Sequence, residues 1–210
     1  MYDNLISFCE DKKLFISDTL KYNRYWDWNI SVTELLSILE DDSFNYVKRN
    51  YAQAIENACE RWKQVHSNIE ENKFDYKNYY SDSLEISSNN KLDKFYLAYK
   101  QWKIINSITI LSSEQTFVKD WLRGTIDAIT NLWVVDYKTS LKENEKYCIQ
   151  VAFYCYLSWE ENWYILYLSK DKYKFVKVDI QKYMPIVLEL IELSKILYKV
   201  NKQENGTTKE

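Results

Sequence analysis

The chain contains the stretch Arg123-Gly124-Thr125-Ile126-Asp127, followed after a short break by Leu132-Trp133-Val134-Val135-Asp136-Tyr137-Lys138-Thr139. Both pieces are rich in β-branched and aromatic residues, which is typical of strands. We therefore predict strands over residues 122–130 and 133–139, joined by a hairpin that turns at Asn131-Leu132. A turn at that point places Asp127 opposite Asp136, with their Cβ atoms roughly 4.5–5.5 Å apart.

Side-chain alternation along the second strand adds a lysine to these two carboxylates. Lys138 follows Asp136 at a spacing of two and so projects from the same face. Two adjacent carboxylates repel each other unless a cation lies between them, and hard oxygen ligands suit Mg²⁺ or Mn²⁺. The pattern predicts a metal site, although an ordinary hairpin with solvent-facing Asp and Lys has the same local sequence. Gly124, just before Asp127, predicts the close approach of a ligand or another backbone.

Two helices are expected to bring further polar side chains to this hairpin. Upstream, apolar residues at spacings of three and four predict a long amphipathic helix over residues 51–73, which carries His66, the only histidine, and Glu70. Downstream, Gln150 and Tyr154 lie four residues apart in a predicted helix over residues 147–158, so both project from one face. A lone helical histidine is more often a packed residue than a metal ligand, so His66 alone does not indicate a metal.

The rest of the chain completes the predicted fold. Ser31-Val32-Thr33-Glu34 fits a capping box and predicts that a short helix begins there. Residues 5–30 show no helical stripe, only a short strand at 14–16. We expect two or three strands between Ile108 and Thr139, and the remaining elements are helices over 95–105 and 184–200 and strands over 163–168 and 173–180. The whole predicts one α/β domain over residues 1–200, a small mixed β-sheet flanked by α-helices, with a disordered tail over residues 201–210.

The composition excludes several classes of protein. The 210 residues are 46% hydrophobic, 17% aromatic and 28% charged, which is typical of a globular domain. No window approaches roughly 18 consecutive apolar residues and no secretory signal is present, so we expect a cytoplasmic protein without membrane contact. The cysteines are few and scattered, which favours reduced thiols. A net charge of −3 argues against a strongly cationic nucleic-acid binder but permits a local basic patch.

In their order and spacing these motifs resemble the PD-(D/E)XK nuclease superfamily, in its RecB-like and phage-type exonuclease branch. The resemblance runs from Ser31 to about Leu157 and comprises an SVT-type helix start, an H-x-x-x-E helix, G-x-x-D, D-x-K-T and Q-x-x-x-Y. It implies a restriction-endonuclease-like core. The family often shows Gly-Thr where this chain has Trp62-Lys63, so the helix that carries the histidine departs from the family's pattern.

The resemblance also implies a role for each motif residue. The groups that look like ligands of Mg²⁺ or Mn²⁺ are His66, Asp127, Asp136 and the main-chain carbonyl of Tyr137. Lys138 looks like the catalytic lysine, acting with the two aspartates. The residues expected to contact substrate are Gln150, Tyr154, Glu70, Glu114, Lys142 and Lys146. Lys142 and Lys146 would form, with Lys138, a face along which DNA lies, with Tyr147 and Trp121 available for stacking, and a solvated charged loop is the alternative.

The implied function is a metal-dependent deoxyribonuclease that hydrolyses phosphodiester bonds, an exonuclease acting on linear DNA ends in phage-type recombination or DNA processing, in a bacterial or phage-infected host cell. Exo- or endonuclease action, DNA or RNA as substrate, a recombination partner protein and a homo-oligomer all stay open. A second interpretation is a catalytically silent nuclease-fold module that binds DNA or acts as a scaffold. A third, a zinc or iron–sulfur protein, would use Cys59 with His66 or Cys148 with Cys155, but the chain has no C-x-x-C pair.

Overall fold

A six-stranded mixed β-sheet lies at the centre of the structure, a computed structural model that describes residues 2–16, 30–40, 52–70, 91–160, 162–169 and 172–206. The strands along its main path are, in order, β2 (Ile30–Ser31), β5 (Leu122–Thr130), β6 (Val134–Lys138), β7 (Trp163–Leu168) and β8 (Tyr173–Lys177). Strand β4 (Ile110–Lys119) pairs with β5 off this path. The β2–β5 and β6–β7 pairs are parallel, whereas β4–β5, β5–β6 and β7–β8 are antiparallel.

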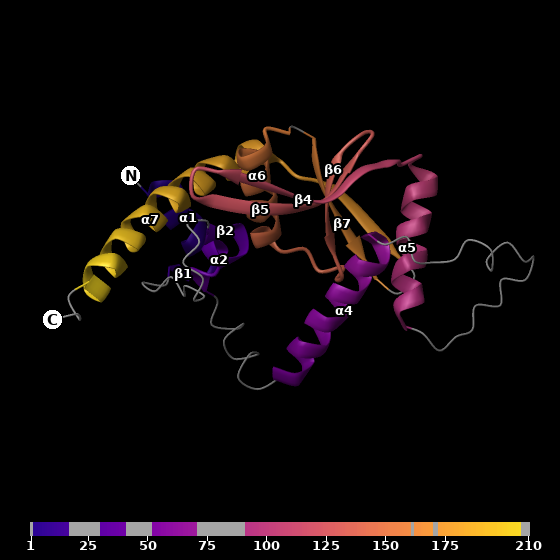
Figure 1. The fold of residues 1–210 in the computed structure, drawn as a ribbon, viewed down its shortest axis with the longest axis horizontal. Helices are drawn as coiled ribbons and strands as arrows, with labels where there is room; N and C mark the ends of the chain where they lie inside the picture. Colours follow the sequence, from indigo (N-terminus) through magenta and orange to yellow (C-terminus); the bar gives the residue numbers. More distant parts are fainter. Residues whose placement is uncertain are drawn as a thin grey trace, which may run out of the picture.

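Helices cover both faces of this sheet (Figure 1). On one face, α4 (Ala52–Glu70) and α5 (Lys91–Ile105) share an apolar cluster with Leu166 and Leu168 of β7. On the other face, an apolar cluster that includes Trp163 and Ile165 of β7 is formed with α1 (Asp3–Lys12), α2 (Val32–Leu36), α6 (Glu145–Ser158) and α7 (Ile180–Gly206). Strand β7 is therefore buried on both sides, which explains its continuous apolar sequence. The predicted α/β class, a small mixed sheet flanked by helices, is confirmed.

The capping box predicted at Ser31 is present and fixes the start of α2. The Glu34 N–H donates to Ser31 Oγ at 3.1 Å, and the Ser31 N–H donates back to Glu34 Oε2 at 2.9 Å. Ser31 also ends β2, where it pairs with Arg123 of β5. The short helix is thus held beside the first residues of the predicted hairpin strand.

The β5–β6 hairpin has the predicted register. Ala128 pairs with Val135 and Ile129 with Val134, and the Thr130 hydroxyl accepts the N–H groups of residues 132 and 133 in the turn. The ladder stops at the next pair. There the Asp127 carboxylate accepts a hydrogen bond of 2.5 Å from the Tyr137 N–H, which leaves Asp127 and Asp136 facing each other across a gap in the backbone pairing.

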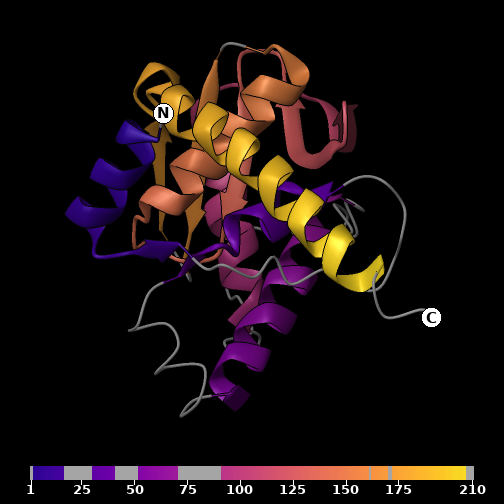
Figure 2. The same ribbon diagram turned by 90° about the vertical axis from the view of Figure 1, so that its left-hand side faces the viewer.

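The N-terminal prediction of an irregular segment is wrong, because residues 3–12 form α1. Only three of its side chains, Leu5, Phe8 and Cys9, are buried, so the helical stripe is short. Its first turn is held by α7, since the Leu5 N–H donates to Glu189 Oε2 at 2.6 Å. Figure 2 shows α1 lying beside α7. The strand predicted at 14–16 is confirmed as β1 (Phe15–Ile16), which pairs with β3 (Leu39–Glu40).

The last helix is longer than predicted at both ends. It begins at Ile180, before Pro185, and runs to Gly206, whereas the sequence predicted a helix over 184–200 and a tail from residue 201. No glycine or proline interrupts the chain between Pro185 and Gly206, so helical hydrogen bonding continues through the polar residues after Val200. Residues 207–210 lie outside the described residues. Among the helices of the described segments, none combines the length and apolarity that crossing a membrane requires.

Candidate active site

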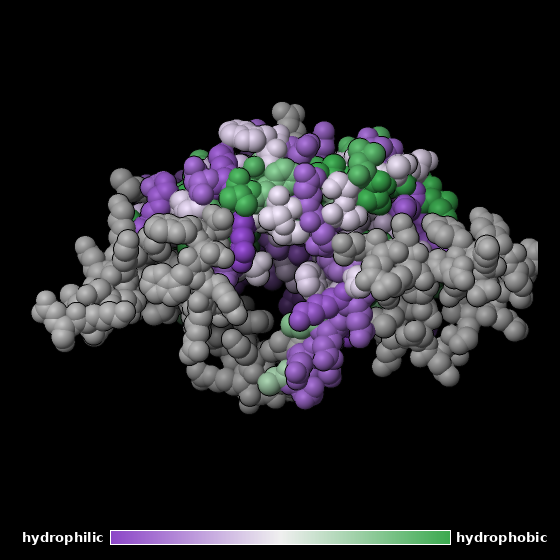
Figure 3. Space-filling model, viewed as in Figure 1, coloured by the Kyte–Doolittle hydropathy of each residue, from purple (hydrophilic) through white to green (hydrophobic). Residues whose placement is uncertain are grey.

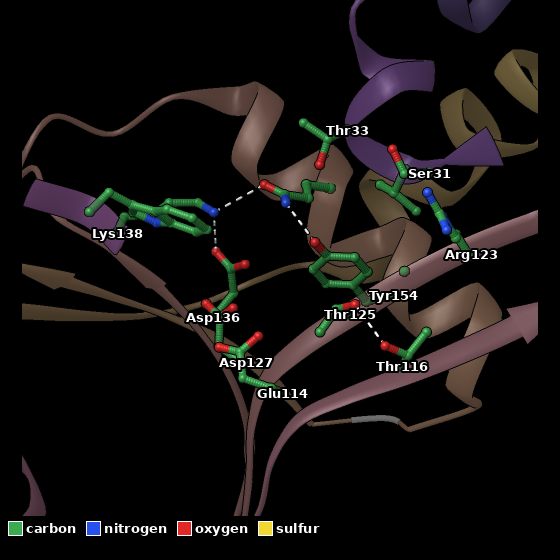
Figure 4. A pocket seen from close by; sticks show the side chains of 14 residues that line it. Ser31, Thr33, Glu114, Thr116, Arg123, Thr125, Asp127, Asp136, Lys138 and Tyr154 are labelled. Carbon is green, nitrogen blue, oxygen red and sulfur yellow. Dashed lines mark hydrogen bonds and ion pairs between the residues drawn. The ribbon is translucent and has the colours of Figure 1, made fainter. Parts of the chain in front are cut away.

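A pocket of about 340 Å³ opens where α2, α4, β4, β5, β6 and α6 meet, and it contains most of the predicted site (Figure 4). Its polar and charged lining side chains are Ser31, Thr33, Glu114, Thr116, Arg123, Thr125, Asp127, Asp136, Lys138, Gln150 and Tyr154. Figure 4 shows Glu114, Asp127 and Asp136 gathered in one part of the pocket, with Arg123 and Ser31 at the other end. Segments far apart in sequence thus converge on one cavity, as the motif order predicted.

Three side chains form what we call the acidic side of the pocket: His66 of α4, Glu114 of β4 and Asp127 of β5. His66 Nδ1 lies 3.4 Å from Glu114 Oε1 and 3.7 Å from Asp127 Oδ1. One potential ligand atom from each of the three lies within 4.8 Å of the others. Imidazole and carboxylate donors at this separation fit a divalent cation, and His66 Nε2 is buried with no hydrogen-bond partner. Asp136 is not a member of this group of three, although it faces Asp127 across the hairpin.

A second set of side chains, which we call the lysine side, continues from Asp136: Lys138, Gln150 and Tyr154. Lys138 Nζ lies 2.6 Å from Asp136 Oδ2 and donates to Gln150 Oε1 at 3.0 Å. Gln150 Nε2 then donates to the Tyr154 hydroxyl at 2.6 Å. The predicted i, i+4 pair on α6 therefore points into the pocket and holds the lysine. The amide of Gln150 uses its oxygen and its nitrogen for different partners, which fixes its orientation.

Gly124 allows α6 to approach the sheet this closely. A Cβ atom at this position would lie 2.8 Å from two ring carbons of Tyr154 and 2.8 Å from Leu157 Cδ1. The prediction that Gly124 marks a close approach is correct, but the neighbour is wrong, because side chains of α6 come near rather than a ligand or another backbone. The G-x-x-D and Q-x-x-x-Y motifs are thus physically linked, since the glycine makes room for the tyrosine.

The two sides of the pocket differ in their protonation. Burial and the nearby charge of Asp136 raise the pKa of Asp127 to about 7. Burial acts to lower the pKa of His66, but the Glu114 hydrogen bond and the charge of Asp127 outweigh burial and raise the pKa. Burial also acts to lower the pKa of Lys138, yet the carboxylates of Asp136 and Asp127 raise it. Lys138 therefore stays positively charged near neutral pH, while Asp127 holds a proton in part of the molecules.

Glu114 has an unusual backbone. Its φ angle is 48°, in the left-handed region that non-glycine residues seldom occupy, at a cost of about 1–3 kcal/mol. The β4–β5 ladder pairs Ser113 with Ala128 and Gln115 with Ile126, and it skips Glu114 between them. The prediction made Glu114 a substrate contact at the head of its strand. The structure places its carboxylate beside His66, within the group that could hold a cation, and its contact with substrate stays a prediction.

The three lysines of the predicted DNA face do not share the pocket, and contact of Lys142 and Lys146 with substrate stays a prediction. Lys138 is buried in the pocket, and half-buried Lys146 donates to the main-chain oxygen of Leu39. Lys142 is exposed in the loop before α6, and neither it nor Lys146 lines the pocket. The reason is that Lys146 lies on the first turn of α6, where β3 supplies a backbone acceptor. The Tyr147 ring packs against the Lys138 ammonium, with 4.8 Å between the ring centre and Nζ. This cation–π contact already engages the ring that was predicted to stack on DNA.

The structure tests the predictions for Tyr137 and Glu70 only in part. The side chain of Tyr137 points away from the pocket into the apolar cluster beneath α4 and α5, where its ring lies 5.6 Å from that of His66, while its N–H binds Asp127. Its carbonyl role as a metal ligand stays a prediction. Glu70 lies on α4, but its side chain is outside the described part of the chain.

Sequence reasoning missed Trp62, Arg123 and the hydroxyl groups of the pocket. Trp62 lines the pocket from α4, with its ring centre 4.3 Å from that of His66. Thr116 and Thr125 share a hydrogen bond of 2.9 Å between their hydroxyls on neighbouring strands. Arg123 belongs to the most informative stretch, and its spacing of two from Thr125 is the signal that could have placed both on one side of β5.

Comparison with known proteins adds little beyond the fold. No family model matches the chain, and no curated protein matches its sequence. Among solved structures, it is similar to SSO0001 with a TM-score of 0.44 and 13% identity, over 91% of this chain and 84% of that one. An alkaline exonuclease from Laribacter hongkongensis, LHK-Exo, gives a TM-score of 0.43 and 10% identity over 86% of this chain and 95% of that one. The complex of LHK-Exo with dAMP gives a TM-score of 0.43 and 8% identity, again over 86% of this chain and 95% of that one.

Proposed function

We propose that this chain is a Mg²⁺- or Mn²⁺-dependent nuclease that hydrolyses phosphodiester bonds, with DNA ends as its substrate. The observation that carries the proposal is that Asp136, Lys138, Glu114 and Asp127 line one pocket, with His66 in contact with the last two carboxylates. Carboxylates and an imidazole on one side and a buried ammonium on the other are what hydrolysis of a charged phosphodiester requires.

Each side of the pocket has a distinct role in the proposed reaction. His66, Glu114 and Asp127 are the residues that would hold the metal, with Asp136 next to them. A bound divalent cation supplies Lewis acidity and an activated water. Lys138, fixed by Asp136 and Gln150, presents a positive charge to the scissile phosphate and donates a hydrogen bond to an oxygen that gains negative charge. Tyr154 holds Gln150 in the orientation that leaves the Lys138 ammonium aimed into the pocket.

The proposal extends to the setting of the activity. Residues 1–200 act as one domain. The expected setting is DNA processing of the recombination type in the cytoplasm. The four free cysteines supply no member of the one His, Cys, Asp and Glu group found among the described residues, which favours Mg²⁺ or Mn²⁺ over a cysteine-bound metal.

Digestion of end-labelled linear duplex, beside covalently closed circular DNA, tests this proposal. We expect linear DNA to be degraded in Mg²⁺ or Mn²⁺, with no degradation in EDTA. Asp136→Asn and Lys138→Ala should each lower the rate by about 10²-fold or more, because each removes a group in contact with the reacting phosphate or its metal. Lys177→Ala, at an exposed position of β8 outside the pocket, is the matched control and should keep wild-type rates.

Other outcomes have defined meanings. Nicking of the closed circle would assign endonuclease action to the same site. Degradation of RNA at an equal or higher rate would change the substrate. If wild type and variants were equally inert in both metals yet bound DNA, the chain would instead be a silent nuclease-fold binding module.

A further inference from the structure

We infer that Trp62 is a stacking platform for an unpaired base, so that the pocket accepts a single-stranded nucleotide at the end of a nucleic-acid chain. This inference rests on the proposed function, because it names the form of substrate that the same pocket takes. It uses a side chain that the proposed chemistry leaves without a role.

Trp62 is placed like a recognition residue rather than a core residue. Trp62 is 40% exposed, whereas Trp102 and Trp163 are fully buried in the core. Of the aromatic rings that line the pocket, Trp62 and Tyr154, only Trp62 is exposed. An exposed indole beside a cluster of carboxylates leaves apolar area uncovered at the point where a substrate would enter.

The indole ring of Trp62 packs against the imidazole ring of His66. Its centre lies 4.3 Å from that of His66, at an angle of 38° between the rings. His66 in turn packs edge-on against Tyr137 at 5.6 Å, and Tyr137 packs against the buried Trp102 at 6.5 Å. This column of rings runs from the core to the pocket and holds Trp62 in place, so little side-chain entropy is lost when a base stacks on its exposed part.

The surroundings of Trp62 suit a nucleic-acid strand. Its neighbours Arg61 and Lys63 on α4 are both exposed and can contact phosphates on either side of the ring. Figure 3 shows the hydrophilic surface of α4 at the edge of a hollow below the sheet. Arg123 provides a further cation within the pocket. Aromatic rings flanked by cations are the usual way in which proteins bind single strands without reading their sequence.

The geometry favours an unpaired base over a duplex. Within a duplex, neighbouring bases cover each other's faces, and only an extruded or terminal base offers a free face to an indole. A cavity of about 340 Å³ admits a group of nucleotide size. It is too small to hold both strands of a double helix.

The test is fluorescence of DNA that carries 2-aminopurine as the last base of a single-stranded overhang, in EDTA and in Ca²⁺, with strand length checked on a gel. Stacking quenches this base, so we expect quenching by the wild type and by Trp62→Phe. Trp62→Ala should show no quenching and bind the overhang about 5- to 10-fold more weakly. Affinity for a blunt duplex should be the same for all three. Trp159→Ala, which removes a more exposed tryptophan outside the pocket, is the matched control and should behave as the wild type.

Equal quenching by Trp62→Ala and the wild type would overturn the inference, as would an equal loss in Trp159→Ala. Quenching by the wild type with no cleavage in Mg²⁺ or Mn²⁺ would refute the proposed nuclease activity and leave the stacking role standing. Cleavage of overhangs and blunt ends at rates that Trp62→Ala does not change would refute the stacking role and leave the nuclease standing.

Discussion

The acidic side and the lysine side of the pocket hold their polar groups in different ways. Lys138, Gln150 and Tyr154 form a continuous chain of contacts between 2.6 and 3.0 Å that begins at Asp136. His66, Glu114 and Asp127 come from three separate elements, with His66 3.4 and 3.7 Å from the two carboxylates, and include a strained backbone position. The lysine side is organised by the protein alone, whereas the acidic side keeps repulsion that a cation would relieve. Substitutions should therefore affect the two sides differently.

The largest expected effect is on the lysine side. Lys138→Met should lower the free energy of unfolding by about 3–5 kcal/mol, because it leaves the Asp136 carboxylate, 1% exposed, buried without its cation. Urea denaturation in EDTA measures the change, and Lys177→Met is the control at an exposed position. A loss below about 1 kcal/mol would mean that the pair contributes no more than a surface ion pair.

The contribution of Asp127, on the acidic side, to the free energy of unfolding should decrease as the pH rises. An ordinary ion-paired aspartate shows the opposite dependence. The pKa of Asp127 rises from 3.8 to about 7 on folding, so the folded state binds the proton more tightly than the unfolded chain does. Its contribution to stability is complete below pH 3.8 and is lost as pH rises to about 7, by up to about 1.4 kcal/mol per pH unit.

The measurement is the free energy of unfolding in EDTA between pH 5 and 7.5, compared with Asp127→Asn. Groups away from the pocket titrate equally in both proteins, so the difference reports Asp127 together with His66, whose pKa the Asp127 charge raises. The variant should gain stability relative to the wild type as the pH increases. A difference in stability that does not change with pH would show that folding does not raise the pKa of Asp127 in the metal-free protein.

Gly124→Ala tests the packing behind the lysine side. The added methyl group meets Tyr154 and Leu157 at 2.8 Å, so we expect a loss of about 1–3 kcal/mol and a displaced Tyr154. The double variant with Leu157→Ala should recover part of this loss, because it removes one of the two clashes. Simple addition of the two single losses would contradict direct contact between these positions.

The smallest effect is expected for Tyr154→Phe. It removes the hydroxyl that accepts from Gln150, at a cost of about 1 kcal/mol, and frees the amide that holds Lys138. Nuclease activity should decrease about 5- to 10-fold with the fold intact. Tyr156→Phe, on the same helix and outside the pocket, is the control. Equal activity in the two variants would mean that Gln150 is held without Tyr154.

The lysine side was largely predictable because its geometry follows from local periodicity. A turn at Asn131-Leu132 sets the register of the hairpin, alternation puts Lys138 beside Asp136, and a spacing of four puts Gln150 and Tyr154 on one helix face. What the pattern could not show is which group each side chain contacts. Lys146 carries the same charge as Lys138, but its partner is a backbone carbonyl at Leu39, distant in sequence.

The acidic side was less predictable because its assembly depends on tertiary structure. The position of Glu114 beside His66 depends on a backbone conformation that no glycine or asparagine at that residue signals. The exposure of Trp62 also depends on where α4 packs on the sheet. From the sequence alone, an apolar residue at a helical spacing is equally consistent with a core position. Helix α1 escaped prediction for a related reason, since its first turn is held by Glu189, far along the chain.

The bond between the Asp127 carboxylate and the Tyr137 N–H has a consequence for spectroscopy. Most amides of a sheet are protected from exchange with solvent deuterium by a backbone carbonyl, and their exchange reports on opening of the sheet. The Tyr137 amide is protected by an ionisable side chain in the middle of the pocket. Its exchange rate and chemical shift therefore report the charge on Asp127, so a single backbone resonance reads out the state of the site in the intact protein.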